Sequence, residues 1–372
     1  MDILLPAPTY LPARRANTIQ VMKMAQALAE TGARVQVLVP DPYRRPPPDW
    51  ETLARHYGLR LRFPVEWLPV RPRWRSYDYA WQVLRRARRR PPDLLYTRHP
   101  QVAAWGSLLE IPTLLEVHDL PRGRLGPLWF RAFLRGRGGR ALVTITRALR
   151  EALPLSGWPR PVLLLPDGVD LERYAALPAP PQARAALGLP ERFTAGYTGH
   201  LYAGRGTAML LDLAARLPRV TFLLAGGNPE DVARLKARAA GLPNLVFTGF
   251  VPNADLPRYQ AACDLLLMPY QPQVAASSGG DIAPFLSPMK VFEYLASGRA
   301  ILSGDLPVLR EVLHPDNAVL LPPADPAAWE AAIRSLLENP ARRAALGAQA
   351  RRDAVQYDWR ARARRIVEVA AG

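Results

Sequence analysis

The chain has 372 residues but only one cysteine, and only three of its 49 basic residues are lysines. The single Cys263 excludes an internal disulfide framework and a metal site built from cysteines. No run of about 18 uncharged apolar residues occurs, so no transmembrane helix is predicted. The N-terminus lacks the basic start and long apolar stretch of a signal peptide. We therefore expect a cytoplasmic protein.

Acidic residues are also scarce, with 32 against 49 basic ones and a formal net charge of +17. This excess calls for anionic partners such as nucleotides, acidic lipid surfaces or nucleic acid. A GC-rich genome would also enrich arginine and deplete lysine, and composition leaves both explanations open. With 49% hydrophobic and 22% charged residues the chain reads as globular, and its length favours two or three domains.

Short apolar runs rich in β-formers alternate with helical patterns along the chain, which predicts parallel sheets covered by helices. The predicted strands are Ile3–Pro6, Arg34–Val39, Asp93–Thr97, Thr113–Val117, Ala141–Thr144, Val162–Leu165, Thr194–Thr198, Val220–Ala225, Leu245–Thr248, Asp264–Met268, Ala300–Leu302 and Ala318–Leu321. One sheet of about twelve strands would be unusually wide, so we expect two. The break falls in Asp167–Arg192, which is rich in proline.

The segment Pro42–Pro92 departs from this rhythm, because runs of arginine alternate there with tryptophan and tyrosine. Basic and aromatic side chains together suit the inner face of an anionic membrane. They would also suit single-stranded nucleic acid, which we rank lowest and do not adopt as a partner. The remaining interpretation is a solvated helix whose aromatic side packs on its own domain.

The segment Ser287–Gly298 reads as one complete helix. Ser287 is placed to cap it, Pro288 fits the first helical position, and Gly298 ends it. Lys290 then lies in the first turn, where the helix dipole disfavours a cation unless an anion such as phosphate lies beside it. The alternative is an ordinary surface pair with Glu293, three residues later.

Polar and glycine residues follow several predicted strands, where open α/β sheets bind their ligands. Thr198-Gly199-His200 and Glu116-Val117-His118-Asp119 each end a strand, and Gly204-Arg205-Gly206 opens a helix. A histidine beside Asp119 at a strand end favours a site role over a structural one. Asn17 is placed to cap the first helix, whose free N–H groups form another anion site.

In their order along the chain, these pieces resemble the retaining glycosyltransferases of family 4 (glycosyl transferases group 1). The matching pieces are Ala16–Thr18, Val117–Asp119, Leu165–Asp170, Tyr197–Gly206, Phe247–Val251 and Ser287–Gly298. The resemblance implies the GT-B fold, an α/β architecture of two Rossmann-like, doubly wound parallel-sheet domains facing a central cleft. We expect an acceptor domain over residues 1–166, a donor domain over 167–356, and a C-terminal helix over 357–372 that crosses back.

The resemblance also implies roles. Arg205 and Lys290 would neutralise the donor diphosphate, His118 would contact the transferred sugar, and these three form the expected catalytic set. The donor site would comprise Gly199, His200, Gly226, Phe250, Val251, Ser287, Pro288, Met289 and Glu293, with Glu293 on the ribose hydroxyls. The acceptor or phosphate loop would comprise Arg15, Asn17, Thr18 and Arg98. No metal or other cofactor is expected.

The expected activity is transfer of a hexose from a nucleoside diphosphate sugar, UDP-sugar rather than GDP-sugar, to a hydroxyl acceptor with retention. The acceptor would be a glycolipid, a polysaccharide or a small glycoside. Phe285 stands where the family usually has an acid, and the donor-sugar contacts would then come from Ser287–Met289 or Asp281. The alternatives are a catalytically silent nucleotide-sugar binding protein and a two-Rossmann epimerase of nucleotide sugars.

Overall fold

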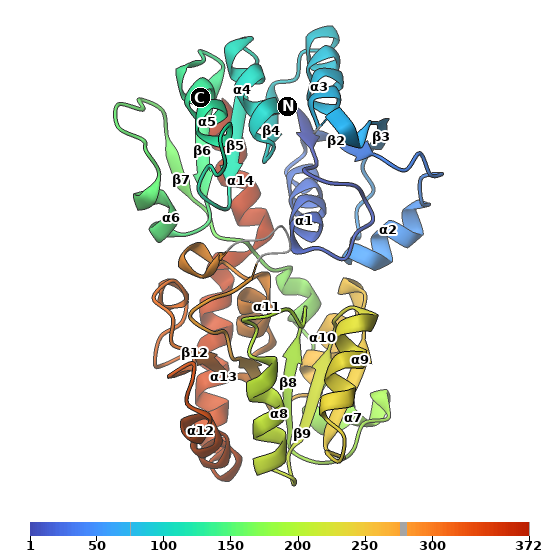
Figure 1. Cartoon of the computed structure of the whole chain (residues 1–372), viewed down its shortest axis with the longest axis vertical. Coiled ribbons are helices and arrows are strands. Elements are labelled where there is room, and N and C mark those ends of the chain that lie inside the picture. The colour runs from blue at the N-terminus through green and yellow to red at the C-terminus, as the bar shows by residue number, and fades with distance from the viewer. Residues whose placement is uncertain (75, 276–280, 372) are drawn as a thin grey trace. The chain divides into compact units, whose positions relative to one another are not determined.

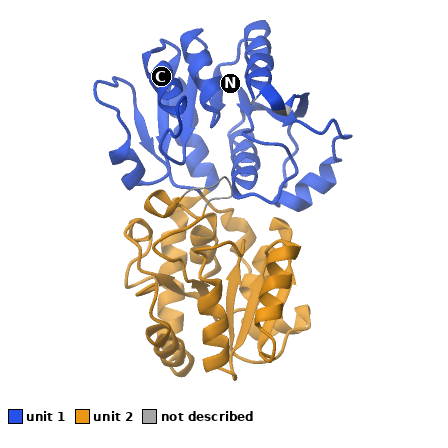
Figure 2. Cartoon of the chain, in the orientation of Figure 1, with its two compact units in different colours: residues 1–167, 359–372 blue, residues 168–358 orange. Residues whose placement is uncertain are grey.

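The computed structural model describes residues 1–74, 76–275 and 281–371 and divides into two compact units (Figure 1). Unit 1 comprises residues 1–167 and the C-terminal segment from Trp359 onward, and unit 2 comprises residues 168–358 (Figure 2). The segment from Trp359 onward forms the helix α14 (Trp359–Ala371), which packs against α1 (Ala16–Glu30).

Unit 1 contains a seven-stranded sheet in which every neighbouring pair is parallel. In spatial order its strands are β3 (Val65–Pro69), β2 (Arg34–Asp41), β1 (Asp2–Pro6), β4 (Leu94–Thr97), β5 (Thr113–Val117), β6 (Gly139–Thr144) and β7 (Val162–Leu164). Its other helices are α2 (Trp50–Tyr57), α3 (Tyr77–Arg89), α4 (Pro100–Leu108), α5 (Gly126–Arg135) and α6 (Arg147–Ala152). Right-handed crossovers put α1 on one face of the sheet and α3, α4 and α5 on the other.

Unit 2 contains a six-stranded parallel sheet. In spatial order its strands are β10 (Leu245–Gly249), β9 (Thr221–Ala225), β8 (Thr194–Thr198), β11 (Leu265–Met268), β12 (Ala300–Gly304) and β13 (Val319–Leu321). Its helices are α7 (Pro180–Leu187), α8 (Thr207–Arg216), α9 (Pro229–Arg238), α10 (Leu256–Ala261), α11 (Met289–Ser297), α12 (Pro326–Glu338) and α13 (Pro340–Ala354). All twelve predicted strands are present, and the predicted class of two doubly wound parallel sheets is confirmed.

Strand order reverses once in each sheet, between β1 and β4 in unit 1 and between β8 and β11 in unit 2. At such a switch point the connections leave in opposite directions, and a crevice opens at the carboxyl ends of the strands. This geometry places Arg98 beside the switch point of unit 1, and Gly199 and the residues after Met268 at that of unit 2.

Three local predictions were wrong. The segment Pro42–Pro92 does not break the βα rhythm, because it contains α2, the strand β3 and α3. Asn17 does not cap α1, since the helix already begins at Ala16 and Arg15 holds the cap position without a side-chain cap. Likewise Ser287 does not cap α11. Pro288 keeps an extended backbone at φ −77° and ψ 124°, so it precedes the helix, which begins at Met289 without a side-chain cap and ends at Gly298 as predicted.

Over the described ranges, none of the helices combines the length and apolar character needed to cross a bilayer.

Candidate active site

Lys290 of unit 2 is a cation held against aromatic rings. It lies in the first turn of α11, and its Nζ is 3.8 Å from the centroid of the Tyr197 ring and 5.5 Å from that of Tyr270. Within the described part of the chain, the buried Nζ has no hydrogen-bond partner. Ring faces attract a cation but supply no acceptor for its three N–H groups. The ammonium is therefore held in place without being neutralised.

Arg205 lies beside it. Its Nη1 donates a hydrogen bond of 2.8 Å to the Tyr270 hydroxyl, and its guanidinium carbon is 5.1 Å from the centroid of the same ring. Its buried Nε finds no acceptor among the described residues. Gly206 permits this loop, because it has φ +75° and a Cβ there would lie 2.0 Å from the Pro269 carbonyl oxygen. Tyr270 thus contacts both cations.

The two cations repel one another. Burial lowers the pKa of Lys290 well below its usual range, Arg205 lowers it further, and Glu293 opposes these effects only in part. An anion of charge −2 or more would relieve both the repulsion and the missing hydrogen bonds. The N–H groups of Lys290 and Arg205 therefore fit a diphosphate.

The glycine at the end of β8 makes room for this lysine. A Cβ at Gly199 would lie 2.9 Å from the Lys290 Nζ, and one at Gly226 would lie 2.4 Å from the Gly199 carbonyl oxygen. His200 follows, and its carbonyl oxygen accepts a 2.5 Å hydrogen bond from the Tyr197 hydroxyl. The structure thus brings Gly199, Gly226, Arg205 and Lys290 together, as the sequence predicts.

Glu293 lies on α11, with Asn253 and Gln260 as its hydrogen-bond donors. Asn253 Nδ2 reaches one carboxylate oxygen and Gln260 Nε2 the other, both at 3.3 Å. Each carboxylate oxygen can accept two hydrogen bonds, so each retains capacity for another donor such as a hydroxyl. Ser287 and Met289, on either side of Pro288, are partly exposed, while Phe250 and Val251 follow β10 at the sheet edge.

Phe285, at the position of the usual acid, ends a short 3-10 turn that spans Ala283–Phe285 and is partly exposed. The nearby Asp281 is already engaged, because its Oδ1 accepts the backbone N–H groups of Val274 at 2.8 Å and Ala283 at 2.9 Å. These two hydrogen bonds give the Asp281 carboxylate a structural role, which argues against it as a substitute contact to the sugar.

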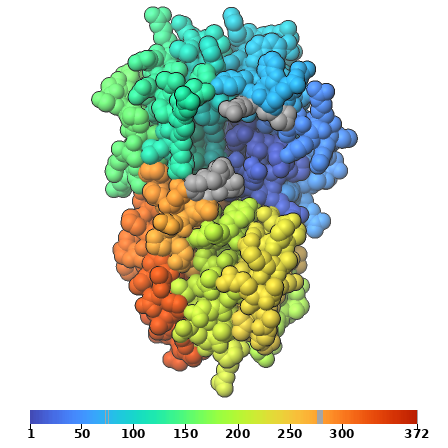
Figure 3. All heavy atoms as spheres, viewed as in Figure 1, coloured from blue at the N-terminus to red at the C-terminus, as the bar shows by residue number. Residues whose placement is uncertain are grey.

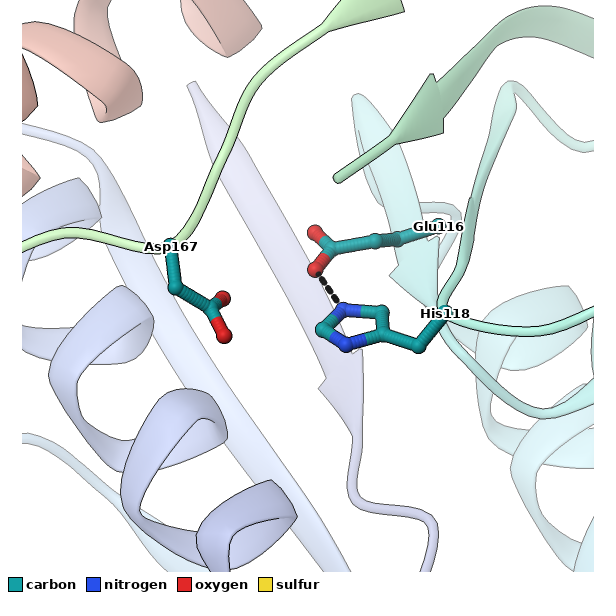
Figure 4. Close-up of side chains that lie close together, drawn as sticks. All are labelled: Glu116, His118 and Asp167. Atoms are coloured by element: carbon teal, nitrogen blue, oxygen red, sulfur yellow. Dashed lines mark hydrogen bonds and ion pairs between the residues drawn. The ribbon is translucent and has the colours of Figure 1, made fainter. Parts of the chain in front are cut away.

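The partner of His118 in unit 1 is not Asp119, on which the sequence prediction rests. Figure 4 shows His118 Nε2 bonded to Glu116, at 2.5 Å from Oε1, with Asp167 facing the same ring. Asp119 instead pairs with Arg122 at 3.0 Å. Glu116 is the fourth residue of β5 and is almost fully buried, so its carboxylate must find its partners inside the protein.

Glu116 is the centre of a buried network. Its Oε1 accepts from Gln20 Nε2 at 2.7 Å, and its Oε2 lies 3.0 Å from Arg362 Nη2 of α14 and also bonds to the Tyr96 hydroxyl. Arg362 donates in addition to the Tyr96 hydroxyl at 3.1 Å and to the Pro166 carbonyl at 2.9 Å. The C-terminal helix therefore supplies the counter-charge for this carboxylate.

These charges set the state of His118. Burial alone would raise the pKa of Glu116, but Arg362 and His118 outweigh it and hold that pKa low, so Glu116 is ionised. Burial and Arg98 lower the pKa of His118, which leaves the ring neutral near pH 7. An ionised Glu116 accepts the Nε2 proton, so Nδ1 becomes the acceptor. The unprotonated Nδ1 can accept a hydrogen bond from a sugar hydroxyl.

The ligand atoms of Glu116, His118 and Asp167 lie within 4.8 Å of one another, as those of a metal site would. Arg362, however, contacts the same Glu116 carboxylate. A guanidinium at this oxygen repels a divalent cation and already supplies the positive charge. We interpret the cluster as an ion-pair network.

The four residues of the expected acceptor or phosphate loop differ in burial and in hydrogen-bond partners. Thr18 is buried, and its Oγ1 donates to the carbonyls of Ala13 and Arg15, both at 2.8 Å, so it holds the chain. Arg15 is exposed and Asn17 is partly exposed. Arg98 donates to Gln20 Oε1 at 3.1 Å, which ties it to the network around Glu116.

Two family models match the chain: Glycosyltransferase Family 4 over residues 18–173 and Glycosyl transferases group 1 over residues 192–339. The chain belongs to the family 4 glycosyltransferases. It is 28% identical over 301 residues to the 2-deoxystreptamine glucosyltransferase of Streptomyces kanamyceticus, a match that covers 68% of this chain and 74% of that protein.

The chain is also 28% identical over 217 residues to the GDP-mannose-dependent alpha-(1-6)-phosphatidylinositol monomannoside mannosyltransferase of Mycolicibacterium smegmatis. That match spans only about half of the relative, 56% of each protein. Among solved structures, Alr3699/HepE of Anabaena in complex with UDP and glucose aligns with a TM-score of 0.76 at 19% identity, covering 100% of both chains. The structural likeness supports the GT-B fold.

Sequence reasoning missed four residues of these sites: Tyr197, Tyr270, Glu116 and Arg362. The two tyrosines carried a usable signal, because both lie at the carboxyl ends of predicted strands. Glu116 also carried one, since a lone acid inside an apolar strand must find a partner. Arg362 carried none, because it is one arginine among four in the last fifteen residues.

Proposed function

We propose that this glycosyltransferase moves a hexose from a UDP-sugar to a hydroxyl acceptor with retention of the anomeric configuration and without a metal ion. The observation that carries the proposal is the pair of buried cations, Lys290 and Arg205, whose N–H groups are incompletely satisfied by the described protein atoms. The motif series, which resembles the retaining enzymes, supports the stereochemical outcome.

In this proposal the bond between the anomeric carbon and the diphosphate oxygen breaks, and the acceptor oxygen bonds to the same carbon. The acceptor proton leaves with the diphosphate. Lys290, Arg205 and the uncapped first turn of α11 stabilise the charge that develops on the leaving group. Glu293 accepts hydrogen bonds from the ribose hydroxyls, and Nδ1 of His118 accepts a hydrogen bond from a hydroxyl of the hexose.

The UDP complex of the Anabaena structure supports uridine as the base. The phosphatidylinositol monomannoside enzyme supports a lipid-linked acceptor. For such an acceptor we propose that the enzyme acts at the inner face of a membrane. The experiment is a panel of UDP- and GDP-hexoses tested with soluble and lipid-linked acceptors. Free UDP together with a new glycoside of retained configuration is the expected result.

Two results of that panel would contradict the proposal. Donor binding without release of nucleoside diphosphate would indicate a catalytically silent nucleotide-sugar binding protein. We consider this alternative because Phe285 stands where the family usually has an acid. A changed nucleotide sugar without transfer would indicate an epimerase.

A further inference from the structure

Most of the large apolar side chains that stay exposed lie on one part of unit 1. Among the described residues twelve such side chains are exposed, and eight of them fall between residues 74 and 128. We call six of these the tryptophan face: Trp74, Tyr77, Trp81, Trp105, Leu125 and Leu128. Trp81 is 59% exposed and Leu128 is 54% exposed. A contiguous apolar patch of this kind marks an interaction site.

The face is continuous across three helices. α4 packs against both α3 and α5, and the side chains of this helix layer lie side by side on the visible face of unit 1 (Figure 3). The Trp129 ring joins them, with its centroid 6.1 Å from that of Tyr77 on α3 and 6.2 Å from that of Trp105 on α4. Residues from three separate βα units therefore form one surface.

The charge of this surface is strongly positive. The helices α3, α4 and α5 carry six arginines and a single acidic residue, Asp78. Arg85 lies over the Trp81 ring, with its guanidinium carbon 4.8 Å from the ring centroid, and Arg88 and Arg89 are exposed on the same helix. Indole rings flanked by arginines suit the headgroup level of an anionic bilayer.

The aliphatic members favour a bilayer over nucleic acid. The aliphatic members Leu125 and Leu128 are exposed at the start of α5, and Leu108 and Leu109, outside the tryptophan face as defined, are exposed at the end of α4. A leucine gains free energy in hydrocarbon but offers no stacking surface to a base. Tyr77 and Leu128 lie in the first turns of α3 and α5, and Trp74 and Leu125 precede those helices. All four are therefore near the carboxyl edge of the sheet, which is the edge that carries His118.

We propose that the tryptophan face docks unit 1 on an anionic lipid bilayer, with the indole rings among the headgroups and Arg85, Arg88 and Arg89 on lipid phosphates. This deepens the proposed function, since it places a membrane beside the edge at which a lipid-linked acceptor would be used. Vesicle binding is measured without donor or acceptor, so its failure and a failure of sugar transfer are separate results.

The test is sedimentation with vesicles of phosphatidylglycerol and phosphatidylcholine, compared with phosphatidylcholine alone. We expect binding to the anionic vesicles only. At about fivefold per basic residue, the variant Arg85→Gln/Arg88→Gln/Arg89→Gln should bind roughly a hundredfold more weakly. The matched control Arg192→Gln/Arg219→Gln/Arg238→Gln removes three exposed charges from unit 2 and should keep most of the binding. Trp81→Ala/Trp105→Ala should weaken binding without changing net charge.

Equal pelleting with both vesicle types, or none with either, would overturn the proposal. So would an equal loss in the control variant, which would reveal attraction by net charge alone. Displacement of the protein from vesicles by a single-stranded oligonucleotide, with the same arginines required for the oligonucleotide, would assign the face to nucleic acid. Unchanged melting temperatures verify that each variant is folded.

Discussion

Lys290 is an ammonium group whose surroundings are completed only by an anion. We expect Lys290→Ala to lower turnover by two or more orders of magnitude, because removing one preorganised charge costs about 3–4 kcal/mol in the transition state. Lys290→Arg should also be impaired, since a planar fork does not fit between Tyr197 and Tyr270 as a compact charge does. The measurement is the rate of UDP release under saturating donor.

The chain offers a matched control in Lys236, which is exposed on α9. Lys236→Ala should turn over like the wild type. Near-normal turnover in Lys290→Ala would refute the role of Lys290 in neutralising the diphosphate.

The lowered pKa of Lys290 predicts that donor binding takes up a proton. A bound diphosphate favours the ammonium form and so raises the Lys290 pKa above the lowered pKa of the free enzyme. Affinity for UDP should therefore fall as the pH rises above the lowered pKa of the free enzyme. Calorimetric titrations in two buffers of different ionisation enthalpy measure the proton count directly.

Lys290→Met serves as the reference for that experiment. It should bind UDP weakly and take up no proton. Proton uptake of the same size in Lys290→Met would assign the titration to another group.

At the scale of single elements, α14 and β5 are joined by one buried ion pair, between Arg362 and Glu116. Removing one partner of such a pair leaves the other charge buried alone. Arg362→Met should therefore lower the free energy of unfolding by about 3–5 kcal/mol. Arg364→Met on the exposed side of α14 should cost far less. Chemical denaturation followed by circular dichroism measures both.

The pH dependence of this loss has a defined sign. The pKa of Glu116 is lowered in the folded protein, so the pair stabilises it above the unfolded pKa of about 4.5 and loses that contribution as the pH falls further. The difference between wild type and Arg362→Met should therefore shrink below pH 4.5. A difference that stays constant down to acid unfolding would show that Arg362 acts through packing alone.

The elements differ in how well their sequences predicted them. Strands such as Thr113–Val117 and Thr194–Thr198 were predicted with the observed bounds, because buried parallel strands are nearly continuous apolar runs. β3 was missed because it is short, its apolar Val65, Trp67 and Leu68 are interrupted by Glu66, and the surrounding segment is rich in arginine. α11 ends where Gly298 predicted, but its start depended on the backbone of Pro288, which no pattern records.

The sites follow the same division. Lys290, Arg205 and Gly199 could be chosen as candidates from the sequence, because each carries a local signal of charge or conformation. The pairing of His118 with Glu116 was missed because the prediction rested on Asp119, the next residue in the sequence. In an extended chain the side chains two residues apart, such as those of Glu116 and His118, lie on the same side. Tyr96 and Arg362 are 266 residues apart, and only the folded chain brings them together.

At the scale of the whole molecule, the proposed chemistry uses charges that the protein itself supplies. We expect enzyme treated with EDTA to keep most of its turnover, because Lys290, Arg205 and the start of α11 already stabilise the leaving diphosphate. The measurement is UDP release before and after chelation, with Mg²⁺ and Mn²⁺ added back. An activity that is abolished by chelation and restored by one of these ions would refute the site as described.

The position of Arg362 also affects how the protein folds during translation. Unit 1 is begun first, yet its sheet contains a carboxylate whose counter-ion is encoded after all of unit 2. Until Arg362 has been translated, Glu116 must stay hydrated or take up a proton, so unit 1 should remain loosely folded on the ribosome while unit 2, which is continuous in sequence, folds. Unit 2 would then complete its folding before unit 1, the reverse of the usual order in which the N-terminal domain folds first.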